Sequence, residues 1–259
     1  MNPSGPDARQ VERSLGSLVE AFRRVARTSD AGWIEERDHV ISIATGMPVA
    51  AFNPTFVVAP PRDPSTALER ARAFYARASI AGELNAWGDA ADTLADAARS
   101  AGLTAGHRIP CMLLAPLVAT TPAAPDLQVR RVQDAAALQV FNDVCAEAFE
   151  LDRPVLAVLD DPRMLEMPGF AFHLGLVDGL AVGTAMTCCI DGVVLIFNVA
   201  TLPSHRRRGI GETMTWSAID HGVQAGCDVA FLQASPDGLP LYERMGFRHA
   251  LEMRTWSLA

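Results

Sequence analysis

The sequence predicts a fold of the α/β (α+β) class, in which a mixed, mostly antiparallel sheet is flanked by helices and the arrangement occurs twice along the chain. Segments with apolar residues at helical spacing alternate with short apolar runs that are typical of strands. In the second half, Asp178-Gly179 and Asp191-Gly192 are signals for tight turns between antiparallel strands. The order of elements starts again after residues 119–125, whose Ala, Thr and Pro content predicts a linker.

The first half begins with a helix over residues 8–28, because Val11, Leu15 and Leu18 fall on one stripe at helical spacing. Asp63-Pro64 is a start signal for a second helix, and Pro60-Pro61 ends the strand before it. A third helix is expected at residues 89–101. The strands expected in this half are residues 33–36, 40–44, 50–52, 55–59, 83–87 and 111–118.

The second half repeats this plan. Helices are expected at residues 135–149 and 212–225, with a short helical or looped segment at 154–168 and a last helix that starts at Ser235-Pro236 and ends at Gly246. The expected strands are residues 127–132, 170–176, 181–188, 192–199, 229–232 and 247–258. We therefore interpret the chain as two domains, residues 1–118 and 126–259, joined by the linker 119–125. The alternative is one domain with a helical N-terminal extension.

Composition limits the kind of protein and partner. The 259 residues are 49% hydrophobic and 20% charged, which is typical of a globular protein with a buried core. The net charge of −8 argues against nucleic acid or an anionic membrane as a partner. No apolar run is long enough to span a membrane and the N-terminus does not look like a signal peptide, so a cytoplasmic protein is expected. The five cysteines form no CxxC pair, and we expect buried, reduced thiols and no metal.

One stretch of the second half, residues 199–211, carries the strongest chemical signal. An apolar strand runs into a turn at Pro203 and then into Arg206-x-x-Gly209-x-Gly211, directly before a helix. Glycines allow a close approach of the backbone to a ligand, and the first amides of a helix attract an anion. Arg206, Arg207 and Arg208 add positive charge beside them. An ordinary surface turn with solvated arginines is the alternative for this stretch taken alone.

A second stretch, Leu241-Tyr242-Glu243-Arg244-Met245-Gly246-Phe247, follows at a distance of one helix and one strand. The first stretch resembles the acyl-CoA pyrophosphate loop of the GNAT superfamily of N-acyltransferases, whose pattern is Gln or Arg-x-x-Gly-x-Gly or Ala. The second resembles that family's Leu-Tyr-x-x-x-Gly-Phe signature. The resemblance is strongest over residues 126–259. It implies a GNAT-type sheet, duplication into two GNAT-like domains, and acetyl-CoA as acyl donor without a metal.

The resemblance also implies which residues hold the cofactor. Backbone groups of Val199 and Thr201 would pair with the pantetheine arm as an added strand would. The pyrophosphate would lie on the amides from Arg206 to Gly211, including Ile210, with Glu212 and Thr213 at the helix start and Glu212 pointing away from the phosphates. Ser235 stands where many relatives carry an asparagine that binds the cofactor arm; it is equally well explained as a helix cap.

Tyr242 occupies the position of the family's general acid, which protonates the departing thiolate. The alternative is a tyrosine that only packs on the sheet. The strand before the loop carries no acid or base where relatives often have one; Asn198 is its one polar residue and can orient water or the amine. We weigh His173, Glu166 and Asp191 as bases from neighbouring segments, with His173 more readily explained as structural. Proton removal by water is also open.

The resemblance thus predicts an N-acetyltransferase that acts on a primary amine of a small molecule or peptide, and it is compatible with a homodimer. The competing interpretation is a non-catalytic acyl-CoA-binding or regulatory module. The missing strand base favours this second interpretation, whereas Tyr242 favours the enzyme, because a pure binder needs no acid for a thiolate. The first half lacks the Arg and Gly spacing, and Pro60-Pro61 removes amide donors there, so it should bind no CoA.

Overall fold

The structure, a computed structural model, describes residues 5–117, 124 and 126–258. It divides into two compact units. The C-terminal unit comprises Met1–Ala21 and Met112–Arg248, and the N-terminal unit comprises Phe22–Cys111 and His249–Ala259. These units differ from the expected division at residues 118 and 126 in where the two ends of the chain are grouped. The start of the first helix belongs with the second half, and the last strand belongs with the first half.

The C-terminal unit is a twisted sheet with helices on both faces. Its strands lie in the order β5-β10-β9-β8-β7-β6. Their bounds are β5 Ala105–Leu114, β10 Val229–Gln233, β9 Val193–Thr201, β8 Leu180–Ile190, β7 Phe170–Val177 and β6 Gln128–Arg131. Only the last residues of β5, from Met112, belong to this unit. Neighbouring strands from β9 to β6 are antiparallel, whereas β9 and β10 are parallel. Parallel neighbours need a crossover connection, and α5 (Ile210–Gln224) supplies it.

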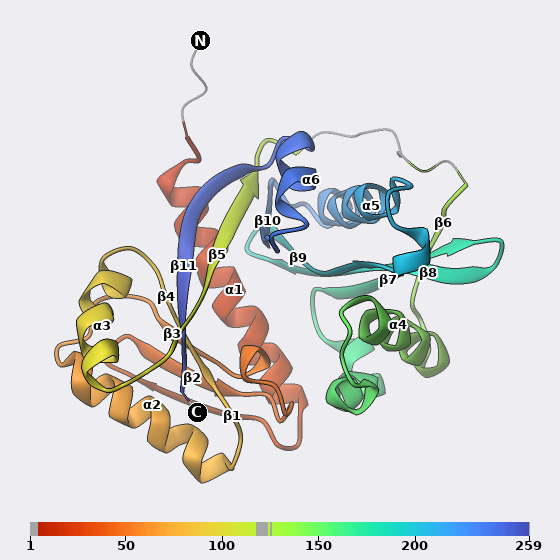
Figure 1. Cartoon of the computed structure of the whole chain (residues 1–259). Coiled ribbons are helices and arrows are strands. Elements are labelled where there is room, and N and C mark those ends of the chain that lie inside the picture. The colour runs from red at the N-terminus through yellow and green to blue at the C-terminus, as the bar shows by residue number, and fades with distance from the viewer. Residues whose placement is uncertain (1–4, 118–123, 125, 259) are drawn as a thin grey trace. The chain divides into compact units, whose positions relative to one another are not determined.

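Two layers of helix cover this sheet (Figure 1). Helix α5 lies on one face of β7, β8 and β9, and α4 (Ala135–Ala148) lies on the other. Short 3₁₀ segments follow α4 at Arg153–Asp160 and Pro162–Glu166, and α6 (Leu239–Arg244) follows β10. Glycine permits the close packing of α5: a Cβ at Gly222 would lie 2.5 Å from the Val194 side chain on β9.

The N-terminal unit has the same kind of plan. Its strands lie in the order β1-β2-β3-β4-β11, with bounds Trp33–Arg37, Val40–Ala44, Pro54–Val57, Glu83–Ala86 and Arg248–Ser257. Strands β3 and β4 are parallel and are joined by α2 (Pro64–Ala78), as β9 and β10 are joined by α5. Helix α3 (Gly88–Ser100) packs beside α2 over a separate apolar core. The end of α1 (Ala8–Thr28) packs its Phe22 ring on Phe56 of β3.

Most expected elements lie where the sequence placed them, and the differences have local causes. Residues 50–52, expected as strand, form a 3₁₀ turn (Ala50–Phe52). The buried Asn53 amide fixes this turn, because it donates to the backbone carbonyls of Met47 and Val49 and accepts from the Thr45 N–H. Strand β5 begins earlier than the expected residue 111. The expected linker lies outside the described residues except for Ala124. Among the described residues, no helix has both the length and the apolar character that a membrane span needs.

Candidate functional site

Strand β9 is open along its last residues on the side of β10. Its parallel pairing with β10 ends at Ile196 and Leu232, whereas its antiparallel pairing with β8 continues to Thr201. A bulge interrupts that second ladder, because β9 advances by three residues, from Phe197 to Ala200, while β8 advances by two. The end of the β9–β10 pairing therefore presents the β9 backbone at residues 198–201 to a ligand that lies between the two strands.

Asn198 is the residue at the bulge. Its φ of +49° is the left-handed conformation that asparagine tolerates better than most residues. The buried Thr184 hydroxyl donates to the Asn198 carbonyl at 2.7 Å, and the Cys145 thiol on α4 lies 3.4 Å from the same hydroxyl. The Thr184 hydroxyl therefore connects the bulge to α4. The Asn198 side chain is half-buried and makes no hydrogen bond with another described residue.

The chain then turns into α5 with a row of unpaired amides. The first intrahelical bond runs from Thr213 N–H to the Gly209 carbonyl at 3.0 Å. Among the described residues, no backbone group accepts a hydrogen bond from the N–H groups of residues 207–212. Gly209, with φ of +78°, and Arg207, with φ of +64°, turn the backbone left-handed immediately before the helix. Such a run of amides at the positive end of a helix dipole forms an anion site.

The three arginines of this loop have two different environments. The Arg206 guanidinium donates to the Ala148 carbonyl at the end of α4, at 2.9 Å, and to the Thr201 carbonyl at the end of β9, at 3.3 Å. Its side chain thus ties the loop to the sheet. Arg207 and Arg208 are exposed and form no ion pair with a described residue. Their charges are the ones available to a ligand.

Two other residues expected at the cofactor have partners within the protein. The Thr213 hydroxyl is buried and accepts from the Ala124 N–H at 3.0 Å. The Ser235 hydroxyl accepts from the Gly238 N–H at 3.1 Å, in the turn that precedes α6, and the N-cap of α6 is Gly238. Glu212 lies half-buried in the first turn of α5, where a carboxylate suits the helix dipole.

Tyr242 packs between α6 and α5 and is 8% exposed. Burial raises the pKa of its phenol to about 12, and a hydrogen bond with the Thr215 hydroxyl of α5 lowers it in part. The Thr215 hydroxyl donates to the Gly211 carbonyl at 2.8 Å, so a polar path runs from the phenol to the first turn of α5. A Cβ at Gly238 would lie 2.9 Å from the Tyr242 ring, so the glycine leaves room for the ring in this position.

The site therefore joins a helix start with unpaired amides, an open bulged strand and a buried phenol. Residues 137–247 match the family model described as "Acetyltransferase (GNAT) family". These residues form a GNAT acetyltransferase domain. No curated protein matches the sequence.

Solved structures with the same fold cover the whole chain. A GCN5-related N-acetyltransferase from Kribbella flavida has a TM-score of 0.72 and 23% identity, over 93% of each chain. One from Sphaerobacter thermophilus has a TM-score of 0.62 and 13% identity, over 96% of this chain and 91% of its own. A tandem GNAT protein from the clavulanic acid biosynthesis pathway has a TM-score of 0.57 and 12% identity, over 94% of each chain. At these identities the likeness shows the fold, which is that of GNAT proteins, including a tandem one.

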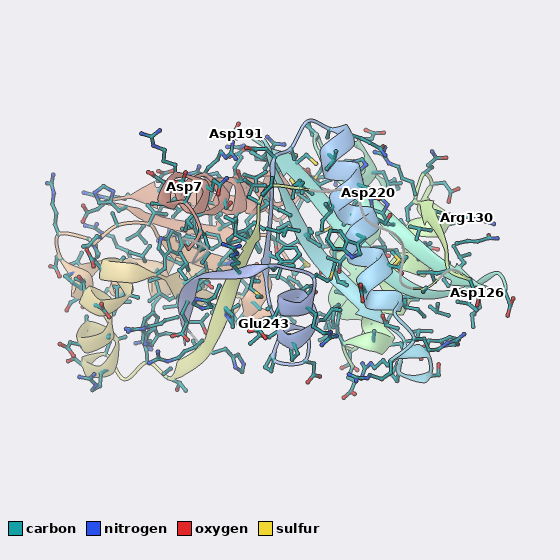
Figure 2. All side chains as sticks on the ribbon, turned by 90° about the horizontal axis from the view of Figure 1, so that it is seen from above. Asp7, Asp126, Arg130, Asp191, Asp220 and Glu243 are labelled. Carbon is teal, nitrogen blue, oxygen red and sulfur yellow. The ribbon has the colours of Figure 1, made fainter. Side chains whose placement is uncertain are left out.

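The base candidates do not gather at the bulge of the GNAT domain. Asp191 lies in the β8–β9 turn, about 20 Å from Asn198 by the rise of an extended strand. In Figure 2 Asp191 and Glu243, the neighbour of Tyr242, lie on different sides of this unit. Glu166 precedes β7, whose first residue pairs with Cys188 near the same turn.

His173 is buried on β7 and faces His221 of α5, with ring centroids 5.4 Å apart. Burial, together with the charges of His221 and Arg131, lowers its pKa to about 4. Since His221 is ten residues beyond Gly211, this pair lies about 15 Å along α5 from the anion site. His173 is thus a neutral core residue remote from that end of the helix, as its structural interpretation expected.

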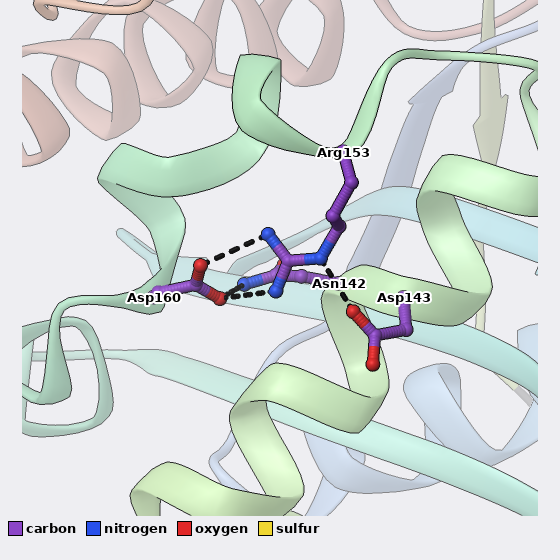
Figure 3. A network of polar contacts seen from close by, with 4 residues as sticks. All are labelled: Asn142, Asp143, Arg153 and Asp160. Carbon is purple, nitrogen blue, oxygen red and sulfur yellow. Dashed lines mark hydrogen bonds and ion pairs between the residues drawn. The ribbon is translucent and has the colours of Figure 1, made fainter.

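The segment after α4 is fixed by a network that the sequence did not indicate (Figure 3). Arg153 makes a two-pronged ion pair with Asp160 and also binds Asp143 of α4, while Asn142 donates to Asp160 at 2.8 Å. These contacts hold the pKa of the Asp160 carboxyl below its usual range, against the effect of burial. Close to them, Glu147, Glu150 and Asp152 are exposed around the end of α4 and form no ion pair with a described residue.

Three supporting residues of the GNAT domain escaped sequence reasoning: Thr184, Thr215 and Gly238. Each acts through a partner distant in the sequence or through a ring that packs against it. Only Gly238 carried a local signal, its place three residues after Ser235 at the start of α6.

Proposed function

We propose that this protein is an N-acetyltransferase that transfers an acetyl group from acetyl-CoA to a primary amine of a small molecule or peptide. The observation that carries the proposal is the row of unpaired amides at residues 207–212, placed directly after the open, bulged end of β9. The GNAT family match at residues 137–247 supports acyl transfer as the chemistry.

The residues present suit acetyl-CoA. In the proposal, the amides of residues 207–212 and the charges of Arg207 and Arg208 bind the pyrophosphate. A Cβ at Gly211 would make only ordinary contacts with Leu241 and Thr201, so the fold leaves space above this residue. The open backbone at Val199 and Thr201 offers hydrogen bonds to the amides of an extended pantetheine arm. Arg206 and Thr213 keep this backbone in shape by their contacts within the protein.

In the reaction the amine nitrogen attacks the thioester carbonyl, the C–S bond breaks, an amide forms and a thiolate leaves. Tyr242 gives its proton to the thiolate. Its pKa of about 12 keeps it protonated at neutral pH. Asn198 orients the amine or a water molecule, and the amine proton leaves to solvent.

The exposed carboxylates at the end of α4 indicate the charge of the acceptor. Arg206 joins the last carbonyl of α4 to the end of β9, so Glu147, Glu150 and Asp152 lie around the same end of that strand. Carboxylates without a cationic partner raise the local concentration of cations. We therefore expect cationic amines to be better acceptors than neutral or acidic ones.

A thiol-release assay with acetyl-CoA tests the proposal against a panel of amines, amino acids and peptides, with mass spectrometry of the acetylated product. Gly211→Asp places a negative charge on the anion site and should abolish turnover. Gly16→Asp adds the same charge on an exposed turn of α1 where a Cβ meets no atom, and should leave turnover unchanged. Calorimetric binding of acetyl-CoA without transfer to any amine would favour the non-catalytic module instead.

A further inference from the structure

Two cysteines far apart in the sequence meet at the far end of α5. Cys189 lies on β8 opposite Val194 of β9, and its side chain shares the α5 face of the sheet with Val194. Helix α5 ends above Val194, where Gly222 contacts that side chain. The connection from α5 to β10 then passes through Cys227, whose N–H donates to the Gly222 carbonyl at 2.9 Å. This connection thus places Cys227 near Cys189, on the α5 side of the sheet.

The two thiols contact each other at the edge of the core. Both are unoxidised, Cys189 is half-buried and Cys227 is 8% exposed. The proximity of Cys189 lowers the pKa of Cys227, and the Arg13 guanidinium lowers it too, whereas burial and Asp228 oppose this. Arg13 is held there by its ion pair with Asp228 at 2.7 Å. Cys227 is therefore the thiol that ionises first, and the same contact raises the pKa of Cys189.

We propose that Cys189 and Cys227 form a redox-active dithiol that low-molecular-weight disulfides oxidise to an intramolecular disulfide. The Cys227 thiolate attacks one sulfur of the oxidant, forms a mixed disulfide and releases one small thiolate. Cys189 then loses its proton to solvent, and its thiolate attacks the Cys227 sulfur and expels the second small thiolate. One disulfide is formed and one is reduced, so electrons balance.

The other cysteines do not share these properties. Cys111 and Cys145 are fully buried, and burial raises the pKa of each thiol to about 12, so neither reacts readily. Cys188 is fully buried, and its side chain points to the opposite face of β8 from that of Cys189. Oxidation should therefore be selective for one pair among five thiols.

The disulfide would tie β8 to the connection between α5 and β10 and close a long loop that contains β9 and α5. A cross-link of this kind stabilises mainly by restricting the unfolded chain. We expect oxidation to raise the Tm by about 5 °C. The change would make stability dependent on the redox state while the anion site at the opposite end of α5 remains free.

Incubation of the native full chain with oxidised glutathione, followed by mass spectrometry, peptide mapping and thermal unfolding, tests this proposal. The expected result is a loss of the mass of two hydrogen atoms, a cross-linked peptide pair containing Cys189 and Cys227, and a raised Tm that excess reductant reverses. Cys189→Ser and Cys227→Ser should each abolish the shift, and Cys111→Ala should retain it.

Two results would overturn the proposal. One is a persistent glutathione adduct on Cys227 with no link to Cys189. The other is an unchanged Tm shift in Cys189→Ser. Because this readout uses neither acetyl-CoA nor an amine, it is independent of the acyltransferase proposal.

Discussion

At the scale of single residues, the ring and the hydroxyl of Tyr242 have separate contacts. Its ring fits over Gly238 and packs edge-on to Phe247, with centroids 5.7 Å apart, while its hydroxyl meets Thr215. A phenylalanine would keep the ring contacts and lose only the hydroxyl. The position thus allows a substitution that separates packing from proton donation.

We expect Tyr242→Phe to lower kcat by about 10²–10⁴-fold, with little change in the apparent affinity for acetyl-CoA. Because the pKa of Tyr242 is about 12 and the acid acts in its protonated form, kcat should show no descending limb from this residue between pH 7 and 10. Single-turnover rates over that range provide the measurement. A parental rate of the chemical step in Tyr242→Phe, or a limb near pH 10 that vanishes in this variant, would contradict the assignment.

At the scale of elements, Arg206 connects three of them. It closes the C-terminal end of α4 through the Ala148 carbonyl, reaches the end of β9 through the Thr201 carbonyl, and opens the loop before α5. Cations at helix C-termini are favourable because they complement the helix dipole. Arg208, two residues on, is exposed and has no such contacts. Neighbouring arginines of one motif therefore carry separate tasks.

Arg206 and Arg208 support a prediction in which each variant is the control for the other. Arg206→Met should lower the free energy of unfolding by about 1 kcal/mol, a modest value because the side chain is exposed. Arg208→Met should leave stability unchanged and weaken acetyl-CoA binding in a salt-dependent way. Denaturant unfolding and calorimetry at two salt concentrations measure both. Equal loss of stability in the two variants would refute the division of roles.

At the scale of the whole molecule, the two units share a parallel crossover but differ at the helix start. In the N-terminal unit, Asp63 caps α2 by accepting from the Thr66 N–H at 3.1 Å and from the Thr66 hydroxyl at 2.7 Å. These bonds lower the pKa of the Asp63 carboxyl, which stays ionised. A negative charge thus lies at the helix start that corresponds to the proposed anion site of the other unit, and Pro61 and Pro64 contribute no amides.

We therefore predict one acetyl-CoA site per chain. Isothermal titration should give a stoichiometry of about one, and Gly211→Asp should remove all binding, because the N-terminal unit has no second anion site. Asp63→Ala serves as the matched control and should leave the stoichiometry unchanged. Two equivalent sites per chain, or residual binding of full stoichiometry in Gly211→Asp, would contradict this asymmetry.

The sequence by itself determined the local features of this protein. Helical stripes, the Asp-Gly turns and the glycine-spaced arginine motif are short-range signals, and they predicted nearly every helix and strand and the left-handed turn into α5. The absence of that motif after Pro60-Pro61 likewise predicted the difference between the two halves. Such features depend on residues a few positions apart, where steric and hydrogen-bonding rules act directly.

Only the tertiary structure decided the features that join distant residues. The last strand pairs with β4, far back in the sequence, because sequence order does not fix the partner of a strand. The same holds for the contacts of Arg206 with the Ala148 and Thr201 carbonyls, and for the bulge that Thr184 fixes at Asn198. Cys189 and Cys227 looked like separate core residues until α5 brought them together, since thiol proximity depends on packing and leaves no pattern in the sequence.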